Sequence, residues 1–113
     1  SQACAWHLPR THALESWGDA RAWDGTLSLQ QPLIDPLYGG KTPAEVLAFL
    51  LGETTLTGYE IVRRAFHETL RPADIEGAWK TALRDGVVAN TALPVQEKLE
   101  AKPLPDRSPE GAR

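Results

Sequence analysis

The sequence predicts a mainly α-helical fold with minor β structure, because it divides into three zones of different composition. Residues 1–40 hold three of the four tryptophans and no sustained helical period, residues 41–93 show three successive helical patterns, and residues 94–113 are rich in proline and charge. We expect residues 1–93 to form a single domain, or a fragment of a larger domain. We expect residues 94–113 to be an extended or disordered tail.

The first zone is expected to be irregular chain that contains one hairpin. Asp24-Gly25 stands between two short runs, residues 20–23 and 26–29, and Asp-Gly favours tight turns because both positions tolerate positive φ. Three indoles so close together in non-helical chain predict either a small aromatic core or a surface that another domain covers. We favour a covered surface for at least one of them. They are Trp6, Trp17 and Trp23.

Two capping-box patterns predict where the first two helices of the second zone begin. In residues 42–45 and again in residues 57–60, a threonine can accept a hydrogen bond from the N3 amide while a glutamate reaches back to the cap. The first helix should end at Gly52, and it places three leucines on one face: Leu47, Leu50 and Leu51. The second helix should end before Pro72.

The third helix is expected from about Ala73 to Asp85, followed by a closing glycine and a short extended segment at residues 87–88. Its apolar stripe includes Trp79, and Phe66 lies on the stripe of the second helix, so both rings are predicted to be core. In the tail we expect at most one turn of helix, around residues 96–101.

Composition disfavours several classes of function. A net charge of −3 without a basic cluster disfavours a nucleic-acid partner. The single cysteine, Cys4, excludes an internal disulfide and a site built of several thiolates. No apolar run approaches the about 20 residues that cross a bilayer, so we expect no direct membrane insertion. The chain starts at Ser1 and has no methionine, so we expect it to be a piece of a longer protein.

Three patterns that suggest chemistry are better explained as structure. One is a zinc-like spacing of Cys4, His7 and His12, with Asp19 as a further ligand, but a single thiolate and an intervening proline favour ordinary hydrogen bonding and packing. Another is the sequence GGKT at residues 39–42, which resembles the end of a phosphate-binding loop. Asp35 occupies the position where that loop needs its first glycine, so helix capping explains the motif better.

The third pattern is a set of carboxylates in the tryptophan-rich zone, where a buried pair could supply a general acid and a general base. No spacing selects a pair among them, although His12 lies near two of them. They are Glu15, Asp19, Asp24 and Asp35. We expect ordinary hydrogen bonding.

A series of short motifs resembles one known family. The motifs are WHLP at 6–9, HALESWGDAR at 12–21, DGT at 24–26, QPLI at 31–34, PLY at 36–38 and WKTALRDGVV at 79–88. Together they resemble the molybdopterin-oxidoreductase-like, iron–sulfur subunit of bacterial alternative complex III and its relatives, which oxidise quinol. The resemblance covers residues 3 to 93.

The resemblance implies that the chain is an internal, non-catalytic segment of a much longer parent protein on the periplasmic face of the bacterial inner membrane. Its partners would be the remainder of the parent and other respiratory-complex subunits. Iron–sulfur clusters would lie elsewhere in the parent, a molybdenum cofactor is doubtful, and this segment would bind no cofactor. The residues implied to make packing or partner contacts are His7, His12, Glu15, Trp17 and Asp19.

Two alternatives remain open. The parent could be a genuine molybdopterin-dependent oxidoreductase, in which case the residues near the pterin pocket would be Asp24, Gly25, Thr26 and Gln31. The chain could instead be an independent small helical protein-interaction module that uses its three N-terminal tryptophans as hot spots.

Overall fold

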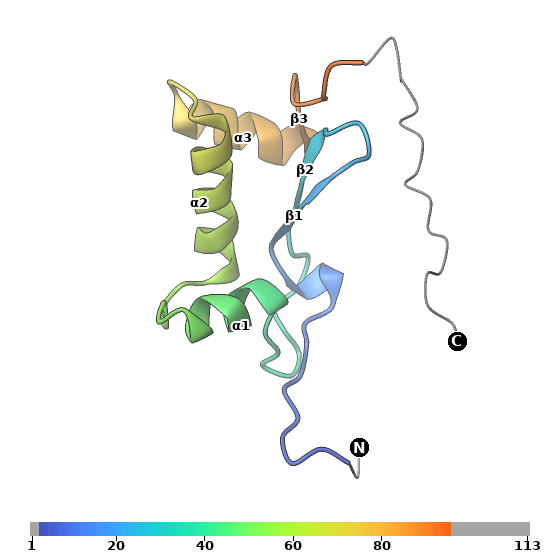
Figure 1. Ribbon diagram of the computed structural model, residues 1–113, viewed down its shortest axis with the longest axis vertical. Coiled ribbons are helices and arrows are strands. Elements are labelled where there is room, and N and C mark those ends of the chain that lie inside the picture. Colours follow the sequence, from blue (N-terminus) through green and yellow to red (C-terminus); the bar gives the residue numbers. More distant parts are fainter. Residues whose placement is uncertain (1–2, 96–113) are drawn as a thin grey trace, which may run out of the picture.

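The computed structural model describes residues 3–95, which form a mixed α/β fold (Figure 1). A short 3-10 helix and a hairpin come first, two helices follow, and a third helix leads directly into the last strand. The elements are η1 (Ala13–Glu15), β1 (Gly18–Arg21), β2 (Leu27–Gln30), α1 (Pro43–Leu50), α2 (Gly58–Leu70), α3 (Ile75–Asp85) and β3 (Val87–Val88).

The three strands form one antiparallel sheet in the order β1-β2-β3. The predicted hairpin and its turn are confirmed, since the Ala22 amide donates to the Thr26 carbonyl at 2.9 Å and Gly25 turns the chain with φ +88°. The strands differ from the predicted runs at 20–23 and 26–29, since β1 ends at Arg21 and β2 begins at Leu27. The predicted extended segment at residues 87–88 is also confirmed, because it pairs with the first two residues of β2. Residues 18–21 and 87–88 therefore lie on opposite sides of β2.

Both predicted capping boxes are present. At the start of α1, Thr42 Oγ1 accepts from the Glu45 amide at 3.1 Å and Glu45 Oε2 accepts from the Thr42 amide at 2.8 Å. Thr57 and Glu60 repeat this arrangement at the start of α2. Capping is therefore the structural role of the residues that resemble the end of a phosphate-binding loop.

The predicted start of the third helix at Ala73 was wrong by two residues. The helix begins at Ile75, because the carboxylate of Asp74 accepts from the Gly77 amide at 3.0 Å and so acts as the N-cap. The prediction placed the boundary by apolar period alone, whereas the side-chain cap fixes it. The C-terminal end at Gly86 is as predicted, with φ +72°.

The core lies where α2 and α3 meet one face of the sheet. Phe66 and Trp79 are 2% and 3% exposed, with ring centroids 5.1 Å apart in an edge-to-face arrangement, so both predicted core positions are confirmed. Leu27 of β2 joins them from the sheet, together with Val62 and Ala82 of the helices. This core is small, and it holds α2, α3 and the sheet together.

No part of the chain that the structure describes covers the predicted apolar face of the first helix. Figure 1 shows α1 at the end of α2 that is farthest from α3, and the only buried residue of α1 is Ala48. The side chains of Leu47, Phe49, Leu50 and Leu51 are 60%, 61%, 72% and 81% exposed. Helical periodicity identified the apolar residues but not whether another part of this chain covers them.

Two predictions concern residues that the structure leaves largely undescribed. Of the predicted tail at 94–113, only residues 94–95 are described, and the turn of helix around 96–101 lies outside the described residues. Among the residues that are described, no helix is both long and apolar enough to cross a membrane.

Candidate functional site

Trp17 joins the hairpin to the two long helices. Its ring is stacked against Trp79 of α3 with centroids 6.1 Å apart, and it meets the Tyr59 ring of α2 edge-on at 4.9 Å. The Tyr59 and Trp79 rings are themselves 5.9 Å apart. We call these three rings the aromatic junction. Helical spacing groups Tyr59 with Val62 and Phe66, but its position in the first turn of α2, two residues after the N-cap Thr57, gives no sign of the contact with Trp17.

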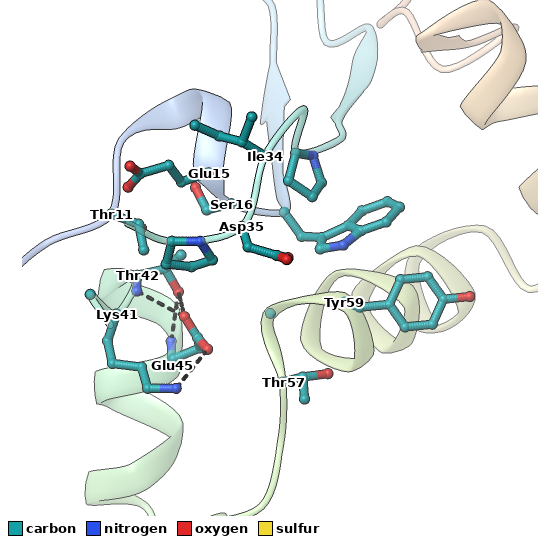
Figure 2. A pocket seen from close by; sticks show the side chains of 15 residues that line it. Thr11, Glu15, Ser16, Ile34, Asp35, Lys41, Thr42, Glu45, Thr57 and Tyr59 are labelled. Carbon is teal, nitrogen blue, oxygen red and sulfur yellow. Dashed lines mark hydrogen bonds and ion pairs between the residues drawn. The ribbon is translucent and has the colours of Figure 1, made fainter. Parts of the chain in front are cut away.

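A cavity of about 430 Å³ lies beside the aromatic junction, where α1 and α2 both begin (Figure 2). Its lining includes the two N-cap threonines, Thr42 and Thr57, and the rings of Trp17 and Tyr59. Asp35 reaches into it from the loop that follows β2. This is the concave region in which hydroxyl, carboxylate and aromatic groups converge, so it is the first place to look for chemistry.

The carboxylate of Glu45, at the start of α1, takes part in hydrogen bonds that cap the helix. Glu45 accepts from the amide and the hydroxyl of Thr42, at 2.8 and 2.9 Å, and its other oxygen lies 3.6 Å from the Lys41 ammonium. Partial burial opposes ionisation of Glu45, but these hydrogen bonds and the positive charge outweigh it, so its pKa lies below the ordinary value. A carboxylate held ionised in this way is a poor proton donor at neutral pH.

His12 and Glu15 form a capping box rather than a catalytic pair. His12 Nδ1 accepts from the Leu14 amide at 3.2 Å, and Glu15 Oε2 accepts from the His12 amide at 3.0 Å. Figure 2 shows the Glu15 carboxylate turned away from Thr57 and Tyr59. The two side chains therefore fix the short helix η1, which delivers Trp17 to the aromatic junction.

The residues implied near a pterin pocket are engaged in the chain's own structure. Asp24 accepts from both the amide and the hydroxyl of Thr26 at 2.9 Å, and these hydrogen bonds hold its pKa below the ordinary value. Gly25 is buried against Leu93. Gln31 lies past the other end of β2, where its amide donates to the Leu83 carbonyl at 2.8 Å. The hairpin turn thus brings three of the four residues together and leaves Gln31 apart.

The remaining implied contact residues lie on the surface. His7 precedes the first element and is exposed, and Asp19 is exposed on β1. Among residues 3–95, no group of three or more His, Cys, Asp and Glu side chains is arranged to hold a metal ion. Of the three N-terminal tryptophans, Trp17 is packed while Trp6 and Trp23 are exposed.

Exposed apolar side chains are the other conspicuous feature of the molecule. We call Leu47, Phe49, Leu50 and Leu51 the α1 surface. An apolar cavity of about 260 Å³ adjoins it, between Leu8, Val46, Phe49 and Leu56. The loop between β2 and α1 adds Leu33, Leu37 and Tyr38, which are also exposed. The sequence contains the signal for the α1 surface, because every residue of PAEVLAFLL except Glu45 is apolar, and helices with so few polar residues are usually buried.

No protein-family model matches the sequence, and no curated protein matches it either. Function is therefore inferred from the arrangement of the residues and from the resemblance of the sequence motifs.

Proposed function

We propose that this chain is a non-catalytic structural segment of a larger protein, whose apolar surfaces pack against the remainder of that protein. On the resemblance of its motifs, the parent is a molybdopterin-oxidoreductase-like, iron–sulfur electron-transfer subunit of a quinol-oxidising respiratory complex. The observation that carries the proposal is the α1 surface, on which four large apolar side chains are more than half exposed.

The free energy available at the α1 surface is large for a chain of this size. Burying a leucine or phenylalanine side chain contributes about 1.5–3 kcal/mol, so covering all four would contribute several kcal/mol. The buried core of the described residues contains only six hydrophobic side chains. Several large apolar side chains exposed on one short helix are typical of a protein contact, and a helix with so few polar residues is typical of an interior.

The polar groups of the chain support a structural role rather than a catalytic one. Glu45 and Glu60 accept hydrogen bonds at helix starts, Glu15 does so at η1, and Asp24 does so in the hairpin turn. The same hydrogen bonds favour a structural role over the pterin-pocket alternative, because the Asp24 carboxylate and the Gln31 amide are bonded to their own chain.

The parent and its surroundings follow from the resemblance. We propose that its partners are the remainder of the parent and other subunits of the respiratory complex, on the periplasmic side of the inner membrane. Any iron–sulfur clusters belong to other parts of the parent.

A second candidate function, an independent protein-interaction module, is favoured by Trp6 and Trp23, because both indoles are almost entirely exposed. Tryptophan is enriched among hot-spot residues of protein interfaces. In this case the 113-residue chain would be stable alone and would bind its partner through the indoles.

A stability comparison tests the proposal. Leu50→Ser should leave the isolated chain's unfolding free energy within about 0.5 kcal/mol, because the side chain is already exposed there. In the full-length parent the same change should cost about 2–5 kcal/mol, as for a buried leucine. Glu68→Ser, at an exposed polar position of α2, serves as the control and should have little effect in the parent.

Equal and small effects of Leu50→Ser in both proteins would contradict the proposal. The metal content of the parent, purified from its own host, then separates the alternatives. Iron without molybdenum supports the electron-transfer subunit. Near-stoichiometric molybdenum supports a molybdopterin enzyme and makes residues 24–31 the first positions to mutate.

A further inference from the structure

One edge of the sheet is open among residues 3–95, and its backbone groups determine what kind of segment can pair with it. Among residues 3–95, β1 is an edge strand, because the sheet order is β1-β2-β3 and the described partner of β1 is β2. An edge strand directs alternate backbone N–H and C=O groups away from the sheet, where an added strand can use them.

The hydrogen bonding of the hairpin identifies the outward-facing residues. The Ala22 amide donates to Thr26, and in an antiparallel ladder such bonded pairs alternate with pairs whose backbone groups face outward. In the register of β1 with β2, Ala20 and Gly18 therefore bond inward, while Asp19 and Arg21 face outward. A second contact agrees with this assignment. Leu29 lies opposite Asp19 in the register, and its amide donates to the Gly86 carbonyl, on the side of β2 away from β1, at 3.0 Å.

The side chains of these two residues point toward the helices. Asp19 lies opposite Leu29 and Arg21 lies opposite Leu27, and directly opposed side chains share a face of the sheet. Leu27 is in the core, so this is the face that α2 and α3 cover. Asp19 and Arg21 nevertheless remain exposed, which places them at the uncovered margin of that face.

A cavity of about 370 Å³ adjoins this margin. It is lined by Gly18 and Asp19 of β1, by Ile61 and Ala65 of α2 and by Ala44 of α1, among others. Ile61 and Ala65 are one helical turn apart on α2 and are partly exposed. The Gly18–Asp19 end of β1 therefore adjoins a recess whose α2 wall is aliphatic. The remaining lining includes the polar residues Arg10, Thr11, Ser16, Gln30 and Thr42.

We propose that an extended segment of the parent pairs with β1 as a fourth strand. This inference rests on the proposed function, because it names the contact by which the parent covers this edge. The backbone of the segment bonds with Asp19 and Arg21, and its helix-facing side chains are small aliphatic groups that contact Ile61 and Ala65. A lysine or arginine of the segment lies beside Asp19, which forms no ion pair among residues 3–95.

The backbone of the edge explains why the partner is a strand. A helix satisfies its own N–H and C=O groups, so a helix laid over β1 would leave the outward groups of Asp19 and Arg21 dehydrated and unbonded. Each such loss is destabilising, because a dehydrated donor or acceptor without a partner loses its hydrogen bonds to water. An extended segment satisfies both residues, because outward groups recur at every second position along each strand.

Amide hydrogen exchange, resolved to single residues, tests the proposal in the 113-residue chain and in the full-length parent. We expect the Ala20 amide to be protected in both, because it bonds to β2. The Asp19 and Arg21 amides should exchange freely in the isolated chain and about 100-fold more slowly in the parent. Equal exchange of these two amides in both proteins would overturn the proposal.

Substitution of one backbone donor provides a second measurement. Asp19→Pro removes an outward N–H and leaves the bonds to β2, which an edge strand tolerates, whereas Asp19→Asn keeps the donor and removes only the charge. In the parent, Asp19→Pro should abolish the protection of Arg21, and Asp19→Asn should retain most of it. Retained protection with proline would overturn the proposal. If Asp19→Pro unfolds the hairpin in the isolated chain, the wild-type exchange comparison decides alone.

The two proposals fail in distinguishable ways. If Leu50→Ser destabilises the parent but not the isolated chain, while Asp19 and Arg21 exchange equally in both, the chain is an integral segment and only the added strand is wrong. If Leu50→Ser has the same small effect in both, the proposed function itself fails.

Discussion

The indole of Trp17 is stacked on the indole of Trp79, with centroids 6.1 Å apart and planes inclined by 26°. The contact joins the start of the hairpin to the middle of α3, across more than half of the described chain. Because Trp79 also meets Phe66, the stack links the irregular N-terminal zone to the core between the helices. The stability of that zone should therefore depend on Trp17.

Trp17→Ala should destabilise the isolated chain by about 2–4 kcal/mol. Removal of a fully buried tryptophan costs about 3–5 kcal/mol, and Trp17 is only partly buried. The hairpin should loosen while α3 persists, because Trp79 keeps its contact with Phe66.

Thermal melting followed by circular dichroism measures the loss, with Trp23→Ala as a matched control. Trp23 is fully exposed, so the control should change stability by less than about 0.5 kcal/mol. Equal melting of both variants would refute a packing role for Trp17.

Thr42→Ala should cost about 1 kcal/mol, because it removes the side chain that accepts from the Glu45 amide at the start of α1. Thr55→Ala, at an exposed position between α1 and α2, should change the unfolding free energy by less than about 0.5 kcal/mol. Urea unfolding of the two variants gives the comparison. If both lose the same amount of stability, the cap does not contribute to stability as the geometry indicates.

Glu45→Gln should reduce the pH dependence of stability between pH 7 and pH 3. The folded-state pKa of Glu45 is lowered, so its ionised form adds stability that is complete above the unfolded pKa of about 4.3 and is lost as the pH falls through the folded value. At pH 7 the variant should be less stable than the wild type, and the gap should narrow below about pH 4. Urea midpoints across this range measure the gap. A constant gap would show that ionisation of Glu45 contributes nothing.

Gly25→Ala should cost about 1–3 kcal/mol. Gly25 has φ +88°, a conformation that strains other residues, and an added Cβ would lie 2.6 Å from Leu93 Cγ. Gly39→Ala is the control for strain alone, because Gly39 has φ +60° and no atom would lie within 4 Å of its Cβ. Thermal melting should rank Gly25→Ala as the more destabilising. Adding Leu93→Ala to Gly25→Ala should recover part of the loss, and no recovery would argue against the steric contact.

Local sequence signals were sufficient for most of the secondary structure. The capping threonines fixed the starts of α1 and α2, Asp24-Gly25 fixed the hairpin, and Gly86 fixed the end of α3. Each of these features depends on residues within about five positions, so a single sequence reveals it. Asp74 shows the limit of local signals, since an aspartate before an apolar period can lie in the first turn of a helix, as predicted, or cap it, as observed.

The candidate site was much less predictable. The resemblance singled out His12, Glu15 and Asp24, and each forms hydrogen bonds within its own turn or cap. The contacts that organise the region instead join distant residues, such as Trp17 with Tyr59 and Gln31 with Leu83. No local pattern encodes such pairs, because they depend on how the elements pack.

The sequence by itself determined where helices begin, where the chain turns and which side chains are apolar, because these follow from local hydrogen bonding and periodicity. Only the tertiary structure decided which apolar side chains are covered. Phe66 and Leu51 both lie on predicted helices, yet Phe66 is enclosed by α3 and the sheet while Leu51 faces outward. Burial requires a second surface at the right distance, and residues 3–95 provide one for α2 and α3 but not for the outer side of α1.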